Sequence, residues 1–373
     1  MQLNTDGKGV NMDRRSFIKG AGLAAAGTAL VTPAIAQERI SITMVATWGR
    51  DFPGLGTGAQ RFAESISKVS DGRIQVDYYA AGERVAAFDS FDEVASGNAQ
   101  AYHAAEYYWK GKHPGFAYFT SVPFGFTNDE INAWIRFGGG QELWDKLAAE
   151  FGTKAMMCGN TGVQAGGWFN KEINSGADFK GLKMRMPGLG GDVLGKIGAS
   201  PVSLPGGQIY ENLVSGAIDA TEWVGPWNDE AMKFYEAAKY YYLSGMHEPG
   251  GSLATGFNLD FWNSLSPADQ ALIEHCAAAA NDIIAAEYNA KNGAALQRLI
   301  DDHGVQVREF NEDVWDTLAD GAIEVREETR DHSALAREID DSFATGMREI
   351  GNWYVNSNSA YVSQRQRIFG VEG

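Results

Sequence analysis

The chain is poor in cysteine and histidine and lacks the common catalytic motifs. Its two cysteines, Cys158 and Cys276, do not define a disulfide framework, and we expect buried thiols because cysteine packs as a small hydrophobe. The six histidines show no close spacing of the kind that binds metal ions. No G-x-S-x-G turn, dinucleotide-binding loop or cysteine motif for haem or iron–sulfur clusters is present. The sequence therefore argues against the common hydrolase and redox enzymes.

Positive charge is also scarce. The 373 residues include 31 lysines and arginines against 48 aspartates and glutamates, a formal net charge of −17. Such acidity argues against nucleic acids and anionic lipids as partners. An anionic ligand would have to be held by local cationic side chains. With 44% hydrophobic and 21% charged residues, the composition is that of a globular protein, and the length allows two domains.

Beyond the N-terminus no apolar run approaches the length of a membrane span. At the N-terminus, Arg14 and Arg15 are followed by Ser-Phe-Ile-Lys, a weakly apolar run over 21–35, and an A-x-A site that ends at Ala36. A basic segment, a short apolar core and such a cleavage site are typical of an export signal. The paired arginines favour the twin-arginine route. We predict that residues 1–36 are this signal and that the protein is periplasmic.

Strand-like and helix-like segments alternate along the rest of the chain. Strands that alternate with helices favour parallel sheets with crossover connections, and hence an α/β fold. The expected strands are 40–46, 73–79, 99–102, 153–157, 167–170, 181–186 and 217–220. The expected helices are 58–70, 85–96, 128–151 with a break near 138–140, 190–197, 208–215 and a long one to about residue 302. Ser266 and Pro267 are a typical start for the last helix.

Three stretches in the middle of the chain each place one polar side chain among glycines and aromatic residues. They are Asn160–Phe169 with Gln164, Gly181–Gly188 with Arg185, and Asp219–Pro226 with Glu222. Glycine permits close backbone approach, tryptophan supplies rigid apolar walls, and arginine can hold a carboxylate with two parallel hydrogen bonds. Together they predict a small pocket that holds an anionic organic molecule without transforming it.

Each of these residues also has an ordinary structural role to weigh. An arginine in a strand is often a surface residue or an ion-pair partner, but the flanking glycines and Pro187 favour ligand binding by Arg185. An acid beside Trp223 at a strand end favours pairing or metal coordination for Glu222 over a rim position. For Trp168 alone, a core position is favoured.

Several short motifs combine into a pattern that resembles one family. They are Tyr79-Ala-Ala-Gly-Glu83, Tyr107-Tyr108-Trp109, Pro123-Phe124, Asn160 to Phe169, Gly181 to Arg185, Gly206-Gly207, Ile209-Tyr210 and Asp219 to Pro226. The pattern resembles the extracytoplasmic solute-binding proteins of tripartite ATP-independent periplasmic (TRAP) transporters, closest to the branch that binds 2-oxo acids such as pyruvate. It extends from about residue 40 to about 330.

The resemblance implies a two-lobed periplasmic binding protein fold with a long helix crossing both domains and a helical C-terminal extension. We expect lobe I over 37–160, completed by parts of 250–330, and lobe II with the ligand-binding segments over 161–249. The long helix is expected over 264–302. The extension, a possible dimer contact, is expected over 331–373. A homodimer and TRAP membrane permease subunits are the implied protein partners.

The resemblance also implies roles for single residues. Arg185 would bind the ligand carboxylate, and Gln164, Glu222 and the backbone carbonyl of Trp223 would coordinate a cation beside it. Sodium is expected before calcium, because calcium prefers more oxygen ligands. The residues expected to contact the ligand are Arg185, Gln164, Trp223, Glu248, Tyr107, Tyr108, Asn160 and Trp168. Where the family has aromatic residues this chain has His247, so the far end of the ligand can differ.

The predicted function is that of a periplasmic receptor. It would capture a small 2-oxo or 2-hydroxy monocarboxylate together with a cation and deliver it to the permease. Three alternatives stay open: a receptor for a larger aromatic or sugar-derived acid, a sensor or scavenging subunit with the same fold, and an exported enzyme. The sequence supports the enzyme least.

Overall fold

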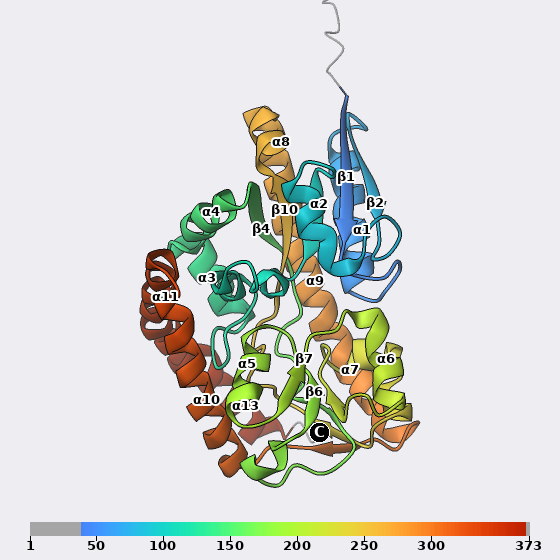
Figure 1. Cartoon of the computed structure of the whole chain (residues 1–373), viewed down its shortest axis with the longest axis vertical. Helices are drawn as coiled ribbons and strands as arrows, with labels where there is room; N and C mark the ends of the chain where they lie inside the picture. The colour runs from blue at the N-terminus through green and yellow to red at the C-terminus, as the bar shows by residue number, and fades with distance from the viewer. Residues whose placement is uncertain (1–38, 371–373) are drawn as a thin grey trace, which may run out of the picture. The chain divides into compact units, whose positions relative to one another are not determined.

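The computed structural model describes residues 39–370. The export signal predicted over 1–36 lies outside them, as do residues 371–373. The chain divides into two units after Arg39, and all elements below belong to the second unit. It contains two β-sheets with flanking helices, one in the upper and one in the lower half of Figure 1. We call the parts built on these sheets lobe I and lobe II.

Lobe I is built on a mixed five-stranded sheet. Its strands are β1 (Ile40–Ala46), β2 (Ile74–Tyr79), β3 (Ala101–Ala104), β4 (Thr153–Asn160) and β10 (Ser252–Asn258). They lie in the order β2-β1-β3-β10-β4. β1 runs parallel to β2 and β3, with Ile40 opposite Ile74 and Met44 opposite Ala101. β10 lies antiparallel between β3 and β4.

Lobe II is built on a six-stranded sheet of short strands. These are β5 (Gly167–Phe169), β6 (Lys183–Arg185), β7 (Ser200–Val202), β8 (Ala220–Thr221), β9 (Tyr240–Tyr242) and β11 (Gln306–Arg308). Their order is β11-β9-β5-β8-β6-β7. β6 is parallel to β7 and β8, whereas β5 is antiparallel to β8 and β9. Parallel neighbours place their carboxyl ends at one edge of the sheet, which positions the site described below.

Helices and short helical turns connect and cover these strands. The α-helices are α1 (Leu55–Val69), α2 (Ser90–Ala95), α3 (Asn128–Phe137), α4 (Gly140–Glu150), α5 (Gly188–Lys196), α6 (Gly206–Val214), α7 (Pro226–Ala231), α8 (Leu259–Ser264), α9 (Pro267–Asp301), α10 (Glu312–Asp331), α11 (Ala334–Gly346), α12 (Asn352–Tyr354) and α13 (Ala360–Phe369). The 3-10 turns are η1 (Ala87–Asp89), η2 (Glu106–Trp109), η3 (Pro114–Phe119), η4 (Gly176–Phe179) and η5 (Phe234–Glu236), and two π-helical turns are η6 (Met347–Gly351) and η7 (Val355–Ser359). No helix of residues 39–370 is long and apolar enough to cross a membrane.

The long helix α9 crosses both lobes (Figure 1), packing on β4 and α1 of lobe I and on α7 of lobe II. It begins as the sequence indicates: the Ser266 hydroxyl accepts a hydrogen bond from the Asp269 N–H, and Pro267 occupies the first turn. Its contact with α1 is close, because a Cβ on Gly58 would lie 2.6 Å from a methyl of Ile284. One rigid element therefore ties the two lobes together.

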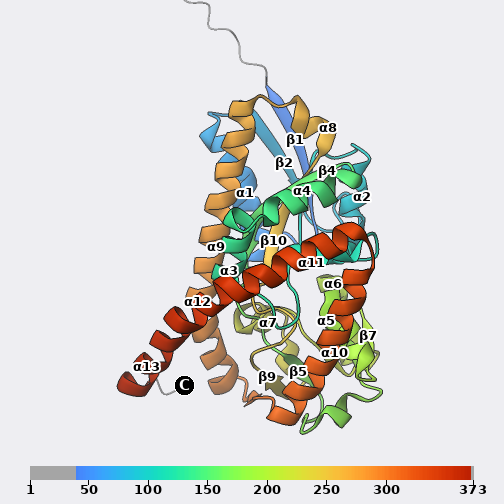
Figure 2. The same ribbon diagram turned by 90° about the vertical axis from the view of Figure 1, so that its left-hand side faces the viewer.

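The C-terminal segment from α11 to α13 is helical throughout. Phe343 on α11 packs edge to face on Trp134 of α3, which anchors this helix to lobe I. The segment then leaves the rest of the protein, and α13 lies at the far end of the projecting helix in Figure 2. α12 and α13 have no buried residue. Their exposed side chains include Trp353 at 71% and Phe369 at 78% exposure.

Some expectations from the sequence are wrong. The sheets are not wholly parallel, since β5 and β10 are antiparallel to their neighbours. The helix expected over 85–96 is only η1 and α2, because Ala86 is extended (φ −62°, ψ 153°). The break near 138–140 is confirmed at Gly139, whose φ of +85° suits glycine. Both cysteines are buried free thiols, as expected. The predicted lobe boundaries stay predictions.

Candidate functional site

The chain passes between the lobes in two segments that lie side by side. Residues 161–166 lead from β4 to β5, and residues 243–251 lead from β9 to β10. They are joined by main-chain hydrogen bonds: the Gln164 N–H donates to the Glu248 carbonyl (2.9 Å), and the Gly245 N–H donates to the Gln164 carbonyl (2.8 Å). This pairing places Gln164 and Glu248, far apart in sequence, next to each other at the junction of the lobes.

Arg185 and Glu222 reach the same place from lobe II. β6 and β8 are parallel neighbours, with Arg185 opposite Thr221. Arg185 ends β6 and Glu222 follows β8, so both lie at the carboxyl ends of their strands. In α/β sheets this edge is where ligands bind. Met184 and Met186, which alternate with Arg185, are buried as well, so both faces of β6 are covered.

Arg185 forms a fully buried ion pair with Glu222, each side chain being 0% exposed. Its Nη1 donates to Glu222 Oε1 and to the Glu222 carbonyl (3.2 Å), and its Nε donates to the Leu204 carbonyl (3.2 Å). The guanidinium also lies 5.1 Å from the Trp223 ring centre. Burial, the largest single influence, lowers the pKa of Arg185, but the combined charges of Glu222, Tyr108, Tyr107 and Glu248 raise the pKa overall. The cation is therefore permanent.

Two further ionisable residues complete the cluster around Glu222. Its second oxygen, Oε2, lies 3.3 Å from His247 Nε2. Glu248 Oε2 accepts a hydrogen bond from Gln164 Nε2 at 2.6 Å. Glu222, His247 and Glu248 offer ligand atoms that all lie within 4.8 Å of one another. Burial, with a further contribution from the Glu222 charge, raises the pKa of Glu248 well above its usual value.

Four polar atoms of this cluster have no hydrogen-bond partner among the described residues. They are Gln164 Oε1, Arg185 Nη2, Trp223 Nε1 and His247 Nδ1. All four side chains are buried. Leaving a buried donor or acceptor unpaired costs about 1–3 kcal/mol, so folded proteins rarely tolerate several together. An unpaired amide oxygen in a cluster with two carboxyl groups suits a cation, and an unpaired guanidinium nitrogen suits an anion.

A small cavity adjoins the cluster, with a volume of about 250 Å³ counting all space between atoms, open solvent included. Its lining comes from lobe I, the crossing segments and lobe II: Trp48, Leu55, Ala105, Tyr107, Tyr108, Thr161, Gln164, Trp223, Val224, Glu248 and Leu253. Trp48 and Tyr107 follow the carboxyl ends of β1 and β3. Burial raises the pKa of Tyr107 well above its usual value and that of Tyr108 to about 12, so both phenols stay protonated and can donate hydrogen bonds.

Most of the residues predicted from the sequence meet here. Gln164, Trp223, Glu248, Tyr107 and Tyr108 line the cavity. Arg185 and Glu222 do not line it; they lie directly behind, where Arg185 interacts electrostatically with both tyrosines and with Glu248.

The structure does not place Asn160 and Trp168 at the cavity. Asn160 connects the crossing segments, accepting from the Gly162 N–H (2.8 Å) and donating to the Gly250 carbonyl (3.4 Å). The Trp168 indole donates to Asp229 (3.0 Å) and stacks on Tyr241 at 4.2 Å. Their polar atoms are engaged within the protein, so we leave both out of the proposed ligand shell.

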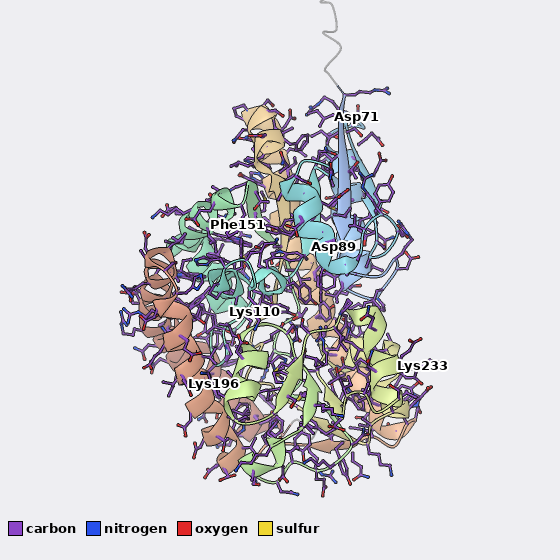
Figure 3. The ribbon with its side chains drawn as sticks, viewed as in Figure 1. Asp71, Asp89, Lys110, Phe151, Lys196 and Lys233 are labelled. Atoms are coloured by element: carbon purple, nitrogen blue, oxygen red, sulfur yellow. The ribbon has the colours of Figure 1, made fainter. Side chains whose placement is uncertain are left out.

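Two residues near the site were missed from the sequence. Trp48 lines the cavity, and its position just after an alternating strand could have indicated this. Asp192 of α5 forms an ion pair with Lys110, which directly follows η2, joining lobe II to lobe I. Lys110 lies between the lobes in Figure 3. Nothing in the local sequence around Asp192 indicates a partner in the other lobe.

Comparisons with known proteins show the family of the chain. The family described as bacterial extracellular solute-binding protein, family 7, matches residues 46–329. A twin-arginine translocation signal matches residues 11–31, so the chain is exported to the periplasm, as the sequence predicted. A monocarboxylate 2-oxoacid-binding periplasmic protein of Nostoc sp. is 35% identical over 350 residues, 92% of this chain and 96% of that protein.

Two solved structures are similar over nearly their whole length. A TRAP periplasmic solute-binding protein of Pseudoalteromonas atlantica, with bound sodium and pyruvate, has a TM-score of 0.85 and 36% identity, covering 87% of this chain and 99% of that one. The corresponding protein of Colwellia psychrerythraea, with calcium and pyruvate, has a TM-score of 0.85 and 38% identity, covering 88% and 100%. The chain thus belongs to bacterial extracellular solute-binding protein family 7, and within it to the TRAP periplasmic solute-binding proteins.

Proposed function

We propose that this protein captures a small 2-oxo or 2-hydroxy monocarboxylate together with a cation and delivers it to the permease of a TRAP transporter. The observation that carries the proposal is the unpaired Arg185 Nη2 and the unpaired Gln164 Oε1 in one buried cluster beside a small cavity. An anion and a cation bound together would satisfy both atoms. The similarity to two pyruvate-binding proteins, one with sodium and one with calcium, supports the same ligand class.

In this proposal Arg185 holds the ligand carboxylate, using the part of its guanidinium that Glu222 leaves free. Gln164, Glu222 and the backbone carbonyl of Trp223 hold the cation. Glu248 orients the Gln164 amide through its hydrogen bond. Tyr107 and Tyr108 contribute phenolic donors from lobe I, and Trp223 forms an apolar wall.

The charge balance explains why a cation is needed. A bound monocarboxylate next to Glu222 would put two negative charges in a buried site that has one permanent positive charge, Arg185. A desolvated surplus charge is costly unless it is paired. A cation held by oxygen atoms restores the balance and bridges the carboxylates. Three oxygen ligands suit sodium better than calcium, which prefers six to eight.

The alternatives are less well supported. A larger aromatic or sugar-derived acid would exceed the small cavity unless the lobes open around it. An enzyme would need a nucleophile or substrate-directed acid–base pair, and within residues 39–370 no serine or cysteine is hydrogen-bonded to Glu222, His247 or Glu248. We therefore propose binding without chemical conversion. The projecting helical tail, with Trp353 and Phe369 exposed, is proposed as the contact of a homodimer.

A thermal-shift screen tests the function. Purified protein freed of ligand by unfolding and refolding is heated with pyruvate, lactate, 2-oxobutyrate and larger acids, each with sodium, calcium or neither. We expect small 2-oxo or 2-hydroxy acids to raise the melting temperature, and the shift to grow with the cation. In Glu222→Gln the dependence on the cation should be blunted. Tighter binding without any cation dependence in Glu222→Gln would contradict the bridge, and a preference for large acids would contradict the ligand class.

A further inference from the structure

A second small cavity, in lobe II, has His247 among its lining residues. It has a volume of about 240 Å³ counting all space between atoms, open solvent included. Its lining is almost wholly apolar and includes Phe169 from β5, Met186 after β6, and Phe310 and Leu318 near and on α10. Neither Arg185 nor Glu222 lines it, and none of the residues that line the site cavity is among its lining residues.

His247 belongs to both regions. Its ring lines the apolar cavity, while its Nε2 faces the carboxylate of Glu222 at 3.3 Å. The next residue, Glu248, lines the site cavity. The imidazole is 3% exposed and is the polar boundary between the charged cluster and the apolar space.

The ring packs closely against two glycines, where any larger residue would clash with it. A Cβ on Gly190, in the first turn of α5, would lie 2.6 Å from His247 Cβ. A Cβ on Gly245 would lie 2.4 Å from His247 Cε1. Contacts this close occur only where glycine lets the backbone approach. The ring is therefore buried and closely packed against these two glycines.

We propose that His247 is a specificity-determining residue that limits the length of the ligand. This inference rests on the proposed function. His247 lines the apolar cavity, and its ring offers a nitrogen within 4.8 Å of a carboxyl oxygen of Glu248, which lines the site cavity. An acid with a short side chain would therefore fit, and one with a branched or longer side chain would meet the ring. Without the ring the two cavities would join, and the apolar space would accept the side chain of a longer 2-oxo acid.

The test compares two acids in four proteins. Pyruvate and 4-methyl-2-oxopentanoate are titrated by calorimetry into the parent, His247→Ala, His247→Phe and Leu318→Ala. His247→Phe removes the contact with Glu222 but keeps an aromatic ring at this position. Leu318→Ala enlarges the apolar cavity on α10 and leaves the His247 ring in place. The quantity to compare is the ratio of the two affinities, because a general loss of structure would weaken the binding of both acids alike.

We expect the parent to prefer pyruvate. His247→Ala should shift the affinity ratio at least 10-fold toward 4-methyl-2-oxopentanoate, since a few methylene groups in an apolar pocket change affinity by this order or more. His247→Phe and Leu318→Ala should keep the parent's ratio within about three-fold. For each variant, a circular dichroism spectrum and a melting curve like those of the parent show that the fold is intact.

Three results would overturn the inference: an unchanged ratio in His247→Ala, an equal shift in Leu318→Ala, or a parent that already prefers the longer acid. If the parent bound neither acid but His247→Ala bound the longer one, the proposed function would be wrong. The inference that His247 limits the length of the ligand would still be supported. If no variant bound either acid, both would be wrong.

Discussion

Two buried carboxylates of lobe II, Glu222 and Asp229, lie in one short stretch of chain but in opposite polar surroundings. Asp229 accepts hydrogen bonds from the Trp168 indole (3.0 Å), the Tyr241 hydroxyl (2.8 Å) and the Val224 N–H (3.2 Å). Both carboxyl oxygens of Asp229 therefore have hydrogen-bond partners, so its network is complete. Around Glu222, by contrast, four polar atoms on neighbouring side chains have no partner in the described part of the chain.

This contrast distinguishes a hydrogen-bond network that stabilises the fold from a cluster that we propose binds a ligand. A complete buried network stabilises one conformation, and the Asp229 network fixes Val224, which follows Glu222 and Trp223. An incomplete network costs stability, and it persists where a ligand completes it. Asp229 thus supports the fold, whereas we propose that a ligand completes the Glu222 cluster.

The largest expected effect is the loss of stability when Asp229 is replaced. Asp229→Ala leaves three buried donors unpaired and should lower the free energy of unfolding by about 3–5 kcal/mol. Urea unfolding measures this directly. Glu230→Ala, on the same helix α7, is the matched control: its ion pair with Arg298 is partly exposed and should contribute at most about 1 kcal/mol. Equal losses in the two variants would contradict the structural role of Asp229.

A third buried carboxyl, Glu106 in lobe I, sharpens the comparison through pH. It has two donors, the Tyr102 hydroxyl (2.6 Å) and the Trp144 indole (3.3 Å), and burial raises its pKa from 4.5 to about 7. The folded protein therefore keeps this proton while the unfolded chain loses it. Stability should fall as pH rises from about 4.5 to about 7 and then level off.

Urea unfolding of the parent and of Glu106→Gln at pH 4 to 8 isolates this contribution. The difference in unfolding free energy between them should move by about 3 kcal/mol against the parent across this range. A difference that does not vary with pH would show that Glu106 is ionised in the folded protein at neutral pH.

On the binding side, Arg185→Lys keeps the charge but loses the planar fork that can serve Glu222 and a ligand carboxylate together. Affinity for pyruvate should fall about 10- to 100-fold, measured by calorimetry on ligand-free protein. Lys183→Ala, an exposed residue of the same strand, should bind as the parent does. Unchanged affinity in Arg185→Lys would remove Arg185 from the site.

The smallest expected effect concerns the contact between the lobes. Asp192→Asn removes the ion pair with Lys110 that joins lobe II to lobe I. Affinity should fall about two- to five-fold, because partly exposed pairs contribute about 0.2–1 kcal/mol. Glu324→Gln removes an ion pair of Lys196 on the same helix α5 (Figure 3) that does not join the lobes, and should leave affinity unchanged. A larger loss of affinity in Glu324→Gln than in Asp192→Asn would contradict a role of the Lys110–Asp192 ion pair in binding.

The sequence predicts the α/β class, the long helix and the central polar residues for clear physical reasons. Ser266 and Pro267 are local signals for a helix start, and they act within a single turn. Gln164, Arg185 and Glu222 stand out because polar side chains among glycines and tryptophans have few purely structural explanations. Such signals depend only on neighbouring residues, so they do not change with the contacts that distant segments make.

Other features depend on contacts between distant segments. The antiparallel insertion of β10, the pairing of Gln164 with Glu248 and the ion pair of Asp192 each need a partner from elsewhere in the chain. Trp168 illustrates the limit: its sequence neighbours favour both pocket and core, and only Asp229 and Tyr241, brought from other elements, determine that it is core.

The most direct measurement is a crystal structure of the protein with pyruvate and either sodium or calcium. The account predicts the ligand carboxylate at Arg185 Nη2 and a cation at roughly 2.3–2.6 Å, the range of calcium–oxygen distances, from Gln164 Oε1, with Glu222 as its second ligand. A ligand bound elsewhere, with Arg185 Nη2 and Gln164 Oε1 still unpaired, would contradict it.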